Sequence, residues 1–192
     1  MRATATAILA FWLSVAALSA FADQPQLRPS RDVDITYSST AAGAPRDGRR
    51  LEQRVRWLAA AQTMRIDPPT TGLFVIIDYL AKRMSVVRAA DRSVTEMAAP
   101  DDTTGVGGNT GAGGYVRRGE DMVAGLACTD WETHDRDGRL AVLCVTADGV
   151  TLRAGVDGQT LVSAVSVQYA PQDPADFRVP ADYAHRSTGA PR

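Results

Sequence analysis

Residues 125–153 read GLACTDWETHDRDGRLAVLCVTADGVTLR, and this stretch decides the predicted fold. Two runs rich in aromatic and β-branched residues stand on either side of DRDG at 135–138, and ADG at 147–149 precedes a third run. Asp-Gly supplies the positive φ that tight hairpin turns need, and connections this short cannot cross over to a parallel neighbour. The stretch therefore predicts consecutive antiparallel strands.

The two cysteines of the chain, Cys128 and Cys144, both lie within this stretch. In an oxidising compartment two lone cysteines of one domain usually pair. A hairpin centred on Arg136 would place them directly opposite each other, whereas other turn types would shift the register by one or two residues. We expect a structural disulfide, with Trp131 on the other face of the hairpin, toward the core. No C-x-x-C spacing is present that would indicate thiol exchange.

The same period of two recurs along the chain. In LEQRVRW, residues 51–57, Leu51, Val55 and Trp57 point to one side and charged residues to the other, which is typical of a half-buried strand. Further strands are expected at 33–38, 74–79, 83–88, 125–133, 139–146, 150–156 and 161–169. Helix signals are weak, at 57–64 and 91–98 only. The class is mainly β, an antiparallel meander with one or two short helices.

The N-terminus has the layout of a secretory signal peptide. Arg2 precedes an apolar run, and Ala20 and Ala22 form an A-x-A cleavage site. The apolar run is shorter than the roughly 20 residues that span a bilayer, so we expect a periplasmic or secreted mature protein without a membrane span. The predicted organisation is a signal peptide at 1–22, an N-terminal lead-in at 23–30, a single β domain at 31–183 and a disordered tail at 184–192.

The composition argues against a nucleic-acid partner and against a phosphate-binding loop. The net charge of −1 at pH 7 lacks the basic excess that nucleic acid selects, so no nucleic-acid partner is expected. Residues 99–114 (APDDTTGVGGNTGAGG) are dense in glycine, threonine and aspartate with little to bury, which predicts a flexible loop. The segment lacks the G-K-[ST] ending and flanking βαβ pattern of a phosphate-binding loop.

Residues suited to catalysis or metal binding are scarce. The two histidines, His134 and His185, fall in a turn and in the predicted tail, where we expect them to be solvated. Asp135 and Asp137 resemble half of a metal site, but turn chemistry explains them without a metal. Neither G-x-S-x-G nor H-E-x-x-H occurs. We therefore expect no catalytic residue, no metal, no cofactor and no enzymatic activity.

Large apolar side chains on the predicted strands can either pack a solid core or surround a ligand. The residues that would line such a cavity are Trp57, Phe74, Ile76, Met84, Trp131 and Leu143.

The segments GEDMVAGLACTDWET at 119–133, CVTADGV at 144–150 and FRVPADY at 177–183 resemble an uncharacterised family of exported bacterial domains. That family is similar to the lipoprotein-carrier (Lol-type) superfamily. The resemblance implies a strongly curved antiparallel sheet, a half barrel closed by short helices around an apolar cavity. Strand patterning alone leaves a closed, lipocalin-like barrel as the alternative. In the closing motif, Phe177 would plug the barrel mouth and Pro180 would end the last strand, with Tyr183 completing the motif.

Three functions follow, in order of preference. The first is a non-enzymatic exported protein that binds a lipid-like or other apolar ligand, or an envelope component, in the cavity of the sheet. The alternative is a periplasmic protein-protein interaction or scaffold module whose partner adds to an open sheet edge. The third is a hydrolase without a recognisable motif. A cavity favours the first function, whereas a filled interior with an exposed edge favours the second.

Overall fold

The computed structural model describes residues 24–39, 51–100, 114–135 and 137–187. The predicted signal peptide and most of the glycine-rich segment, residues 101–113, therefore lie outside the described residues. Within the described ranges no helix is both long and apolar enough to cross a membrane.

The described chain forms one sheet of twelve strands and two short 3-10 helices, η1 (Ala59–Ala61) and η2 (Pro174–Phe177). The strands are β1 (Val33–Ser39), β2 (Leu51–Leu58), β3 (Thr63–Asp67), β4 (Leu73–Asp78), β5 (Arg83–Arg88), β6 (Ser93–Ala98), β7 (Val116–Val123), β8 (Leu126–His134), β9 (Leu140–Val145), β10 (Thr151–Val156), β11 (Gln159–Gln168) and β12 (Ala184–Ser187).

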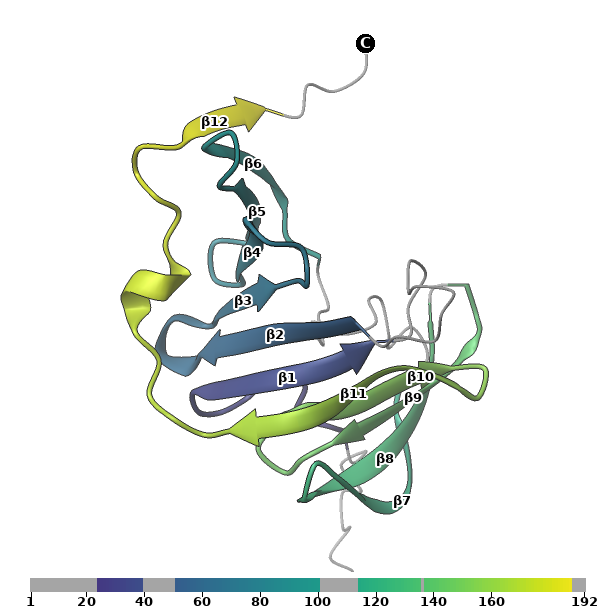
Figure 1. Ribbon diagram of the computed structural model, residues 1–192. Helices are drawn as coiled ribbons and strands as arrows, with labels where there is room; N and C mark the ends of the chain where they lie inside the picture. The colour runs from purple at the N-terminus through teal and green to yellow at the C-terminus, as the bar shows by residue number, and fades with distance from the viewer. Residues whose placement is uncertain (1–23, 40–50, 101–113, 136, 188–192) are drawn as a thin grey trace, which may run out of the picture.

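Two antiparallel meanders make up the sheet, one running from β1 to β6 and the other from β7 to β11. They join where β1 pairs antiparallel with β11. β12 adds to β6 as a parallel strand, so β12 and β7 form the two edges of the described sheet. Figure 1 shows the curved sheet open between these edges. The half-barrel class is confirmed, and the closed-barrel alternative is wrong.

The inner face of the curved sheet carries the main core. On β1 the buried residues Val33, Ile35 and Tyr37 alternate with half-exposed ones, because successive side chains of a strand point to opposite faces. Val33 lies opposite Trp57 of β2, and Trp57 lies opposite Met64 of β3. Burial of such side chains is worth about 1.5–3 kcal/mol each, which makes these cross-strand rows the main stabilising feature of the fold.

The hairpin of β8 and β9 is present, and a disulfide joins Cys128 and Cys144 with 5.4 Å between their Cα atoms. Its register differs by two residues from the one predicted, because Asp130 lies opposite Cys144. The cause is the turn: the Asp135 side chain accepts hydrogen bonds from the backbone N–H groups of Asp137 and Arg139, which moves the centre of the hairpin toward the C-terminus. A shift of two preserves the faces of a strand.

Trp131 accordingly faces Leu143 on the inner face, as predicted, and both are buried. On the opposite face Arg153 of β10 lies beside Cys144 in the ladder. Its guanidinium binds Asp121 of β7 at 2.7 Å and Asp130 of β8 at 3.1 Å. The ion pairs therefore tie β7, β8 and β10 together on the face that carries the disulfide.

Four strands were not expected from the sequence: β3, β6, β7 and β12. The predicted helical turn at 57–64 is confirmed as η1, whereas the one at 91–98 is wrong, since Ser93–Ala98 forms β6. Val94 and Thr95 are β-branched, and Val94 is fully buried against β5, so pairing with an available strand outweighs the weak helical propensity. The boundary of the predicted tail is also wrong, because residues 184–187 form β12.

The N-terminal segment 24–30 is packed against the domain, although the sequence indicated a separate lead-in. Leu27 contacts the core, and the Arg28 guanidinium lies 4.6 Å from the centre of the Tyr79 ring. The Ser30 N–H donates to the carbonyl oxygen of Asp148 at 2.9 Å. Gly149 has a φ of 92°, and a Cβ there would lie 2.2 Å from the Arg28 carbonyl oxygen. The turn between β9 and β10 therefore needs glycine to seat this segment.

Candidate functional site

Four of the six residues predicted to line a cavity lie on the inner face of the sheet. They are Trp57, Met84, Trp131 and Leu143. Trp57 is 2% exposed, Trp131 6% and Leu143 1%, and all three belong to one continuous core with Met84 packed against it. These side chains pack together in this core and fill the inner face, so they serve as core residues.

The other two, Phe74 and Ile76, lie on the outer face. Phe74 lies opposite Val87 and Ile76 opposite Ser85, whereas the inner face of β4 carries Val75 and Ile77. Both residues are covered on this side: the Arg65 guanidinium lies 4.1 Å from the centre of the Phe74 ring, and the segment between β11 and β12 lies over Ile76. We call this segment, residues 169–183, the strap. In Figure 1 it runs along the left side of the molecule from the end of β11 to β12.

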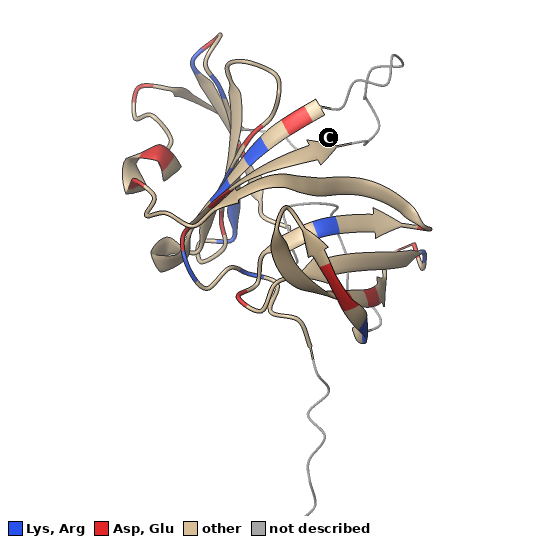
Figure 2. Ribbon diagram, turned by 60° about the horizontal axis from the view of Figure 1, so that its bottom comes forward, with Lys and Arg blue, Asp and Glu red and all other residues tan. Residues whose placement is uncertain are grey.

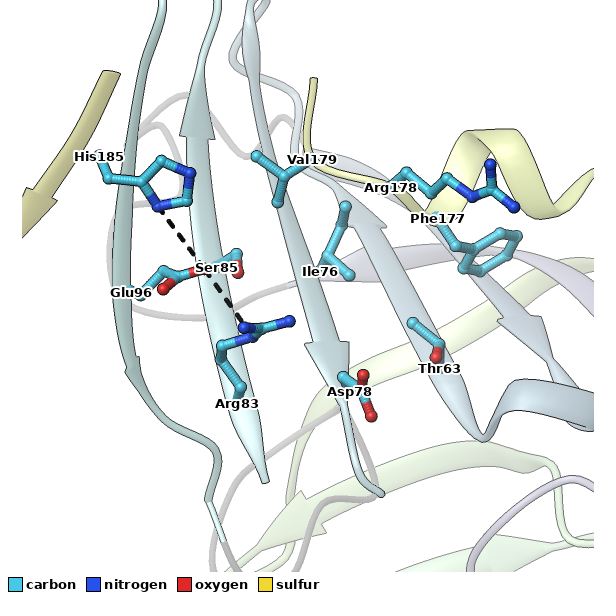
Figure 3. Close-up of a pocket in the computed structure, with 10 residues that line it drawn as sticks. All are labelled: Thr63, Ile76, Asp78, Arg83, Ser85, Glu96, Phe177, Arg178, Val179 and His185. Carbon is cyan, nitrogen blue, oxygen red and sulfur yellow. Dashed lines mark ion pairs between the residues drawn. The ribbon is translucent and has the colours of Figure 1, made fainter. Parts of the chain in front are cut away.

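A pocket of about 460 Å³ lies between the strap and the outer face of β3 to β6. Its lining residues are Thr63, Ile76, Asp78, Arg83, Ser85, Glu96, Phe177, Arg178, Val179 and His185 (Figure 3). Ile76 and Phe177 give the pocket a buried apolar part, and Ser85 adds a buried hydroxyl. The volume falls within the range of small-ligand sites, and the walls carry charges of both signs.

A cluster of charged residues fixes the strap beside this pocket. The Arg56 side chain is 9% exposed and donates to Asp176 at 2.5 Å and to Asp67 at 3.1 Å. Arg65 donates to the carbonyl oxygen of Asp176 at 2.7 Å. Phe177 then buries its ring at the end of η2. The strap is therefore held on the sheet by one buried apolar side chain and by the ion pair between the nearly buried Arg56 and the half-exposed Asp176.

The closing motif is placed differently from the expectation. Phe177 packs on the outer face of the sheet instead of at the mouth of the barrel. Pro180 does not end the last strand, because β12 follows it; its carbonyl oxygen accepts the Tyr183 N–H at 3.2 Å. The Tyr183 ring centre lies 5.9 Å from the Arg92 guanidinium. The motif thus shapes the strap, which the strand pattern could not show.

His185 was assigned to a solvated tail, but on β12 it borders the pocket (Figure 3). Its Nδ1 atom lies 3.8 Å from Glu96, and Arg83 approaches the same carboxylate at 3.8 Å. Sequence reasoning missed Asp78, Arg83 and Glu96 as well. They share the outer face with apolar residues such as Ile76 and Val87, so strand alternation did not single them out. Nothing in the sequence indicated that the chain would return to cover this face.

The acidic turn after β8 behaves as predicted from turn chemistry. Asp135 accepts the backbone N–H groups of Asp137 and Arg139 and the Arg139 guanidinium. Desolvation opposes ionisation of Asp135, but the hydrogen bonds from Arg139 outweigh it and lower the pKa of this carboxyl. Among the described residues no group of three or more His, Cys, Asp or Glu is arranged to hold a metal ion. His134 is exposed at the end of β8.

The opposite edge of the sheet is open to solvent. β7 is exposed along nearly its whole length, with Val116 51% and Met122 68% exposed. Basic and acidic positions are interspersed along the strands instead of gathering by sign (Figure 2). Exposed edges of this kind are where sheet proteins add strands from partners.

Comparison with known proteins identifies the fold. No family model and no curated protein sequence matches the chain. Among solved structures, an uncharacterised conserved protein from Thermus thermophilus aligns with a TM-score of 0.57 and 16% identity, over 82% of this chain and 91% of that one. MucB aligns with a TM-score of 0.52 and 14% identity, over 83% of this chain and 61% of its own. PNGF-II aligns with a TM-score of 0.51 and 10% identity, over 82% and 31%.

The chain thus spans less than two thirds of MucB and less than a third of PNGF-II, and more than nine tenths of the Thermus protein. At these identities the likeness concerns the fold alone. The chain shares the open, curved, mainly β architecture of these structures.

Proposed function

We propose that this protein is an exported, non-enzymatic module that binds another protein of the cell envelope. The observation that carries the proposal is the packing of the inner face. Trp57, Trp131 and Leu143 are all buried in one core, so the surface that would hold a lipid is occupied by the protein's own side chains. A filled interior favours an interaction module over a carrier.

The likeness to MucB supports the same class. MucB shares this fold at a TM-score of 0.52, and it has been solved in a complex with MucA. A curved sheet of this type is therefore compatible with protein binding. Export rests on the signal-peptide pattern of residues 1–22.

The β7 edge offers the kind of surface that such a module needs. An extended partner segment can pair with an edge strand through backbone hydrogen bonds, and side chains on alternate positions then confer specificity. Val116 and Met122 add exposed apolar surface to this edge.

An apolar ligand is the second candidate, because one row of the inner face reaches solvent. Ile77, Met84 and Met97 are cross-strand neighbours on β4, β5 and β6, and Met97 is 37% exposed. Leu80, in the turn after β4, is 66% exposed. A lipid-like ligand would bind at this end of the sheet.

Two measurements on protein purified gently from its native envelope separate the candidates. A photo-crosslinking amino acid at Met122 should give a discrete protein adduct, whereas the same group at Glu52, exposed on the central strand β2, should not. Native mass spectrometry of the same preparation should show no bound lipid. A co-purifying lipid together with equal crosslinking at both positions would reject the protein-binding proposal in favour of the carrier.

A further inference from the structure

β12 is attached to the sheet by exposed contacts only. Its described side chains, Ala184, His185 and Arg186, are all exposed, so the strand adds nothing to the core. Four residues pair in parallel with β6, a geometry that is slightly less stable per residue than the antiparallel one. The other attachments are a hydrogen bond from the Ala184 N–H to the carbonyl oxygen of Arg92 at 2.8 Å and ion pairs between largely exposed side chains, which contribute little stability in water.

The attachment of the strap upstream is different. Phe177 is 8% exposed, and Arg56, which holds Asp176, is 9% exposed in its side chain. The chain is therefore fixed at η2 and only lightly held at β12. The segments that open most easily are those with the fewest buried contacts. β12 can therefore separate from β6 while η2 stays in place.

The edge beneath β12 is marked by acidic side chains, and β12 meets them with basic ones. Arg186 lies 3.2 Å from Asp91, and His185 lies 3.8 Å from Glu96. Asp91 also accepts a hydrogen bond from Ser93 at 2.6 Å, which fixes its carboxylate at the start of β6. Arg186 and Asp91 thus carry complementary charges, and His185 is complementary to Glu96 when it is protonated.

We propose that β12 is a built-in placeholder, and that the β6 edge binds an extended partner segment that carries basic residues at the positions of His185 and Arg186. This inference rests on the proposed protein-binding function and names a second site for it, at the end of the sheet opposite β7. The partner strand displaces β12, pairs with β6 through its backbone, and sets its basic side chains against Asp91 and Glu96.

The pocket gives this edge a means of selection. His185 forms part of the pocket wall next to Glu96, and Asp78 and Ser85 line the same space (Figure 3). A lysine or arginine in place of His185 is longer and would reach further into the pocket, toward these acceptors. Arg83 already lies near Glu96, so a partner's cation must share that carboxylate.

The test uses the full mature chain and a labelled synthetic peptide with the sequence of residues 181–192, ADYAHRSTGAPR. In the wild type the tethered β12 competes with the peptide and lowers its apparent affinity. Arg186→Glu places two acids together at Asp91 and releases β12, so the peptide should bind this variant at least about tenfold more tightly in fluorescence anisotropy. Arg118→Glu is the matched control, because it likewise replaces the cation of an ion pair by an acid, beside Glu132 at the other end of the sheet. This variant should bind the peptide no better than the wild type.

Hydrogen exchange on the same variants reports whether β12 opens locally. Residues 184–187 should exchange faster in Arg186→Glu than in the wild type, while β1 to β5 keep their protection. A peptide with glutamate at the His185 and Arg186 positions should not bind.

Equal peptide affinity in Arg186→Glu and the wild type, or protection of β12 equal to that of β5, would overturn the placeholder. A protein adduct at Met122 combined with that result would leave the protein-binding function standing and remove only this site. Tight peptide binding to Arg186→Glu without any envelope protein adduct would instead count against the proposed function.

Discussion

Cys144 lies directly opposite Asp130 in the β8–β9 ladder, and the disulfide partner Cys128 lies two residues before Asp130. The disulfide therefore crosses the β8–β9 ladder obliquely, and on its other side Cys128 lies opposite Asp121 of β7. Arg153 binds both Asp121 and Asp130 on this face. A covalent link and a charged one thus reinforce the same corner of the sheet.

Replacement of both cysteines by serine should lower the free energy of unfolding by up to about 3 kcal/mol, the value for a closed loop of this size. The loss should be smaller than that limit, since the Asp135 turn already favours the hairpin. Urea unfolding of the double variant and of the oxidised wild type measures the difference. Identical midpoints would show that the hairpin alone sets the stability of this corner.

Gly149→Ala should destabilise the domain and release its N-terminal segment. A Cβ at this position would lie 2.2 Å from the Arg28 carbonyl oxygen, and φ is 92°, so strain and overlap act together. We expect a loss above about 2 kcal/mol and rapid proteolysis within residues 24–30. Gly138→Ala is the control: its φ of 76° is also positive, but nothing lies within 4 Å of the added Cβ. Equal losses in the two variants would mean that the contact with Arg28 is not tight.

Asp176→Ala should weaken the strap, because it leaves the nearly buried Arg56 guanidinium with Asp67 as its remaining partner. The cost of losing such a charged hydrogen bond is about 1–3 kcal/mol. Chemical denaturation should show this loss, and hydrogen exchange should localise it to η2 and β12. Glu120→Ala removes an ion pair whose carboxylate is 77% exposed and should have no measurable effect. A comparable loss in both variants would contradict the role assigned to Arg56.

The stability of the domain should depend on pH through Asp148. Desolvation opposes ionisation of Asp148, but hydrogen bonds from Thr146, Arg31 and Tyr169 outweigh it and lower the pKa of this carboxyl. A lowered pKa in the folded state contributes stability above the pKa of the unfolded chain and loses it as the pH falls through the folded value. The melting temperature should therefore fall more steeply in the wild type than in Asp148→Asn as the pH drops below about 4, the pKa of an unperturbed aspartate. Parallel curves would exclude this contribution.

Much of the fold was predictable because its signals are local. The eight runs with a period of two all appear as strands, and the hairpin turn falls where expected, with the Gly138 N–H donating to the carbonyl oxygen of Asp135. Trp131 faces the core as predicted, since the register error of two residues preserves the faces of a strand. The register itself was not predictable, because it depends on how the Asp135 carboxylate binds two backbone N–H groups.

The site was not predictable from strand patterns, because the strap that completes it comes from a distant part of the chain. Alternation on β4 placed Phe74 and Ile76 on a buried face. It could not show whether that face was the inner or the outer one, because both are covered in the structure. His185 and Glu96 are far apart in sequence and meet only because β12 adds to β6. The packing of residues 24–30 against the domain was not predictable either, because it depends on the close approach of the Arg28 carbonyl to Gly149.

The pairing of β1 with β11 has a consequence for how the chain reaches its native state. Each meander is built from neighbouring segments, whereas the seam brings Ile35 beside Val167 from opposite ends of the domain. Closing so large a loop is entropically costly, so we expect hairpins within each half to form rapidly and the seam to close last, as the rate-limiting event. Until the seam closes, the unpaired edges of both halves are prone to aggregation. A disulfide that forms early would order the β7–β11 half in advance and so shorten the lifetime of this intermediate.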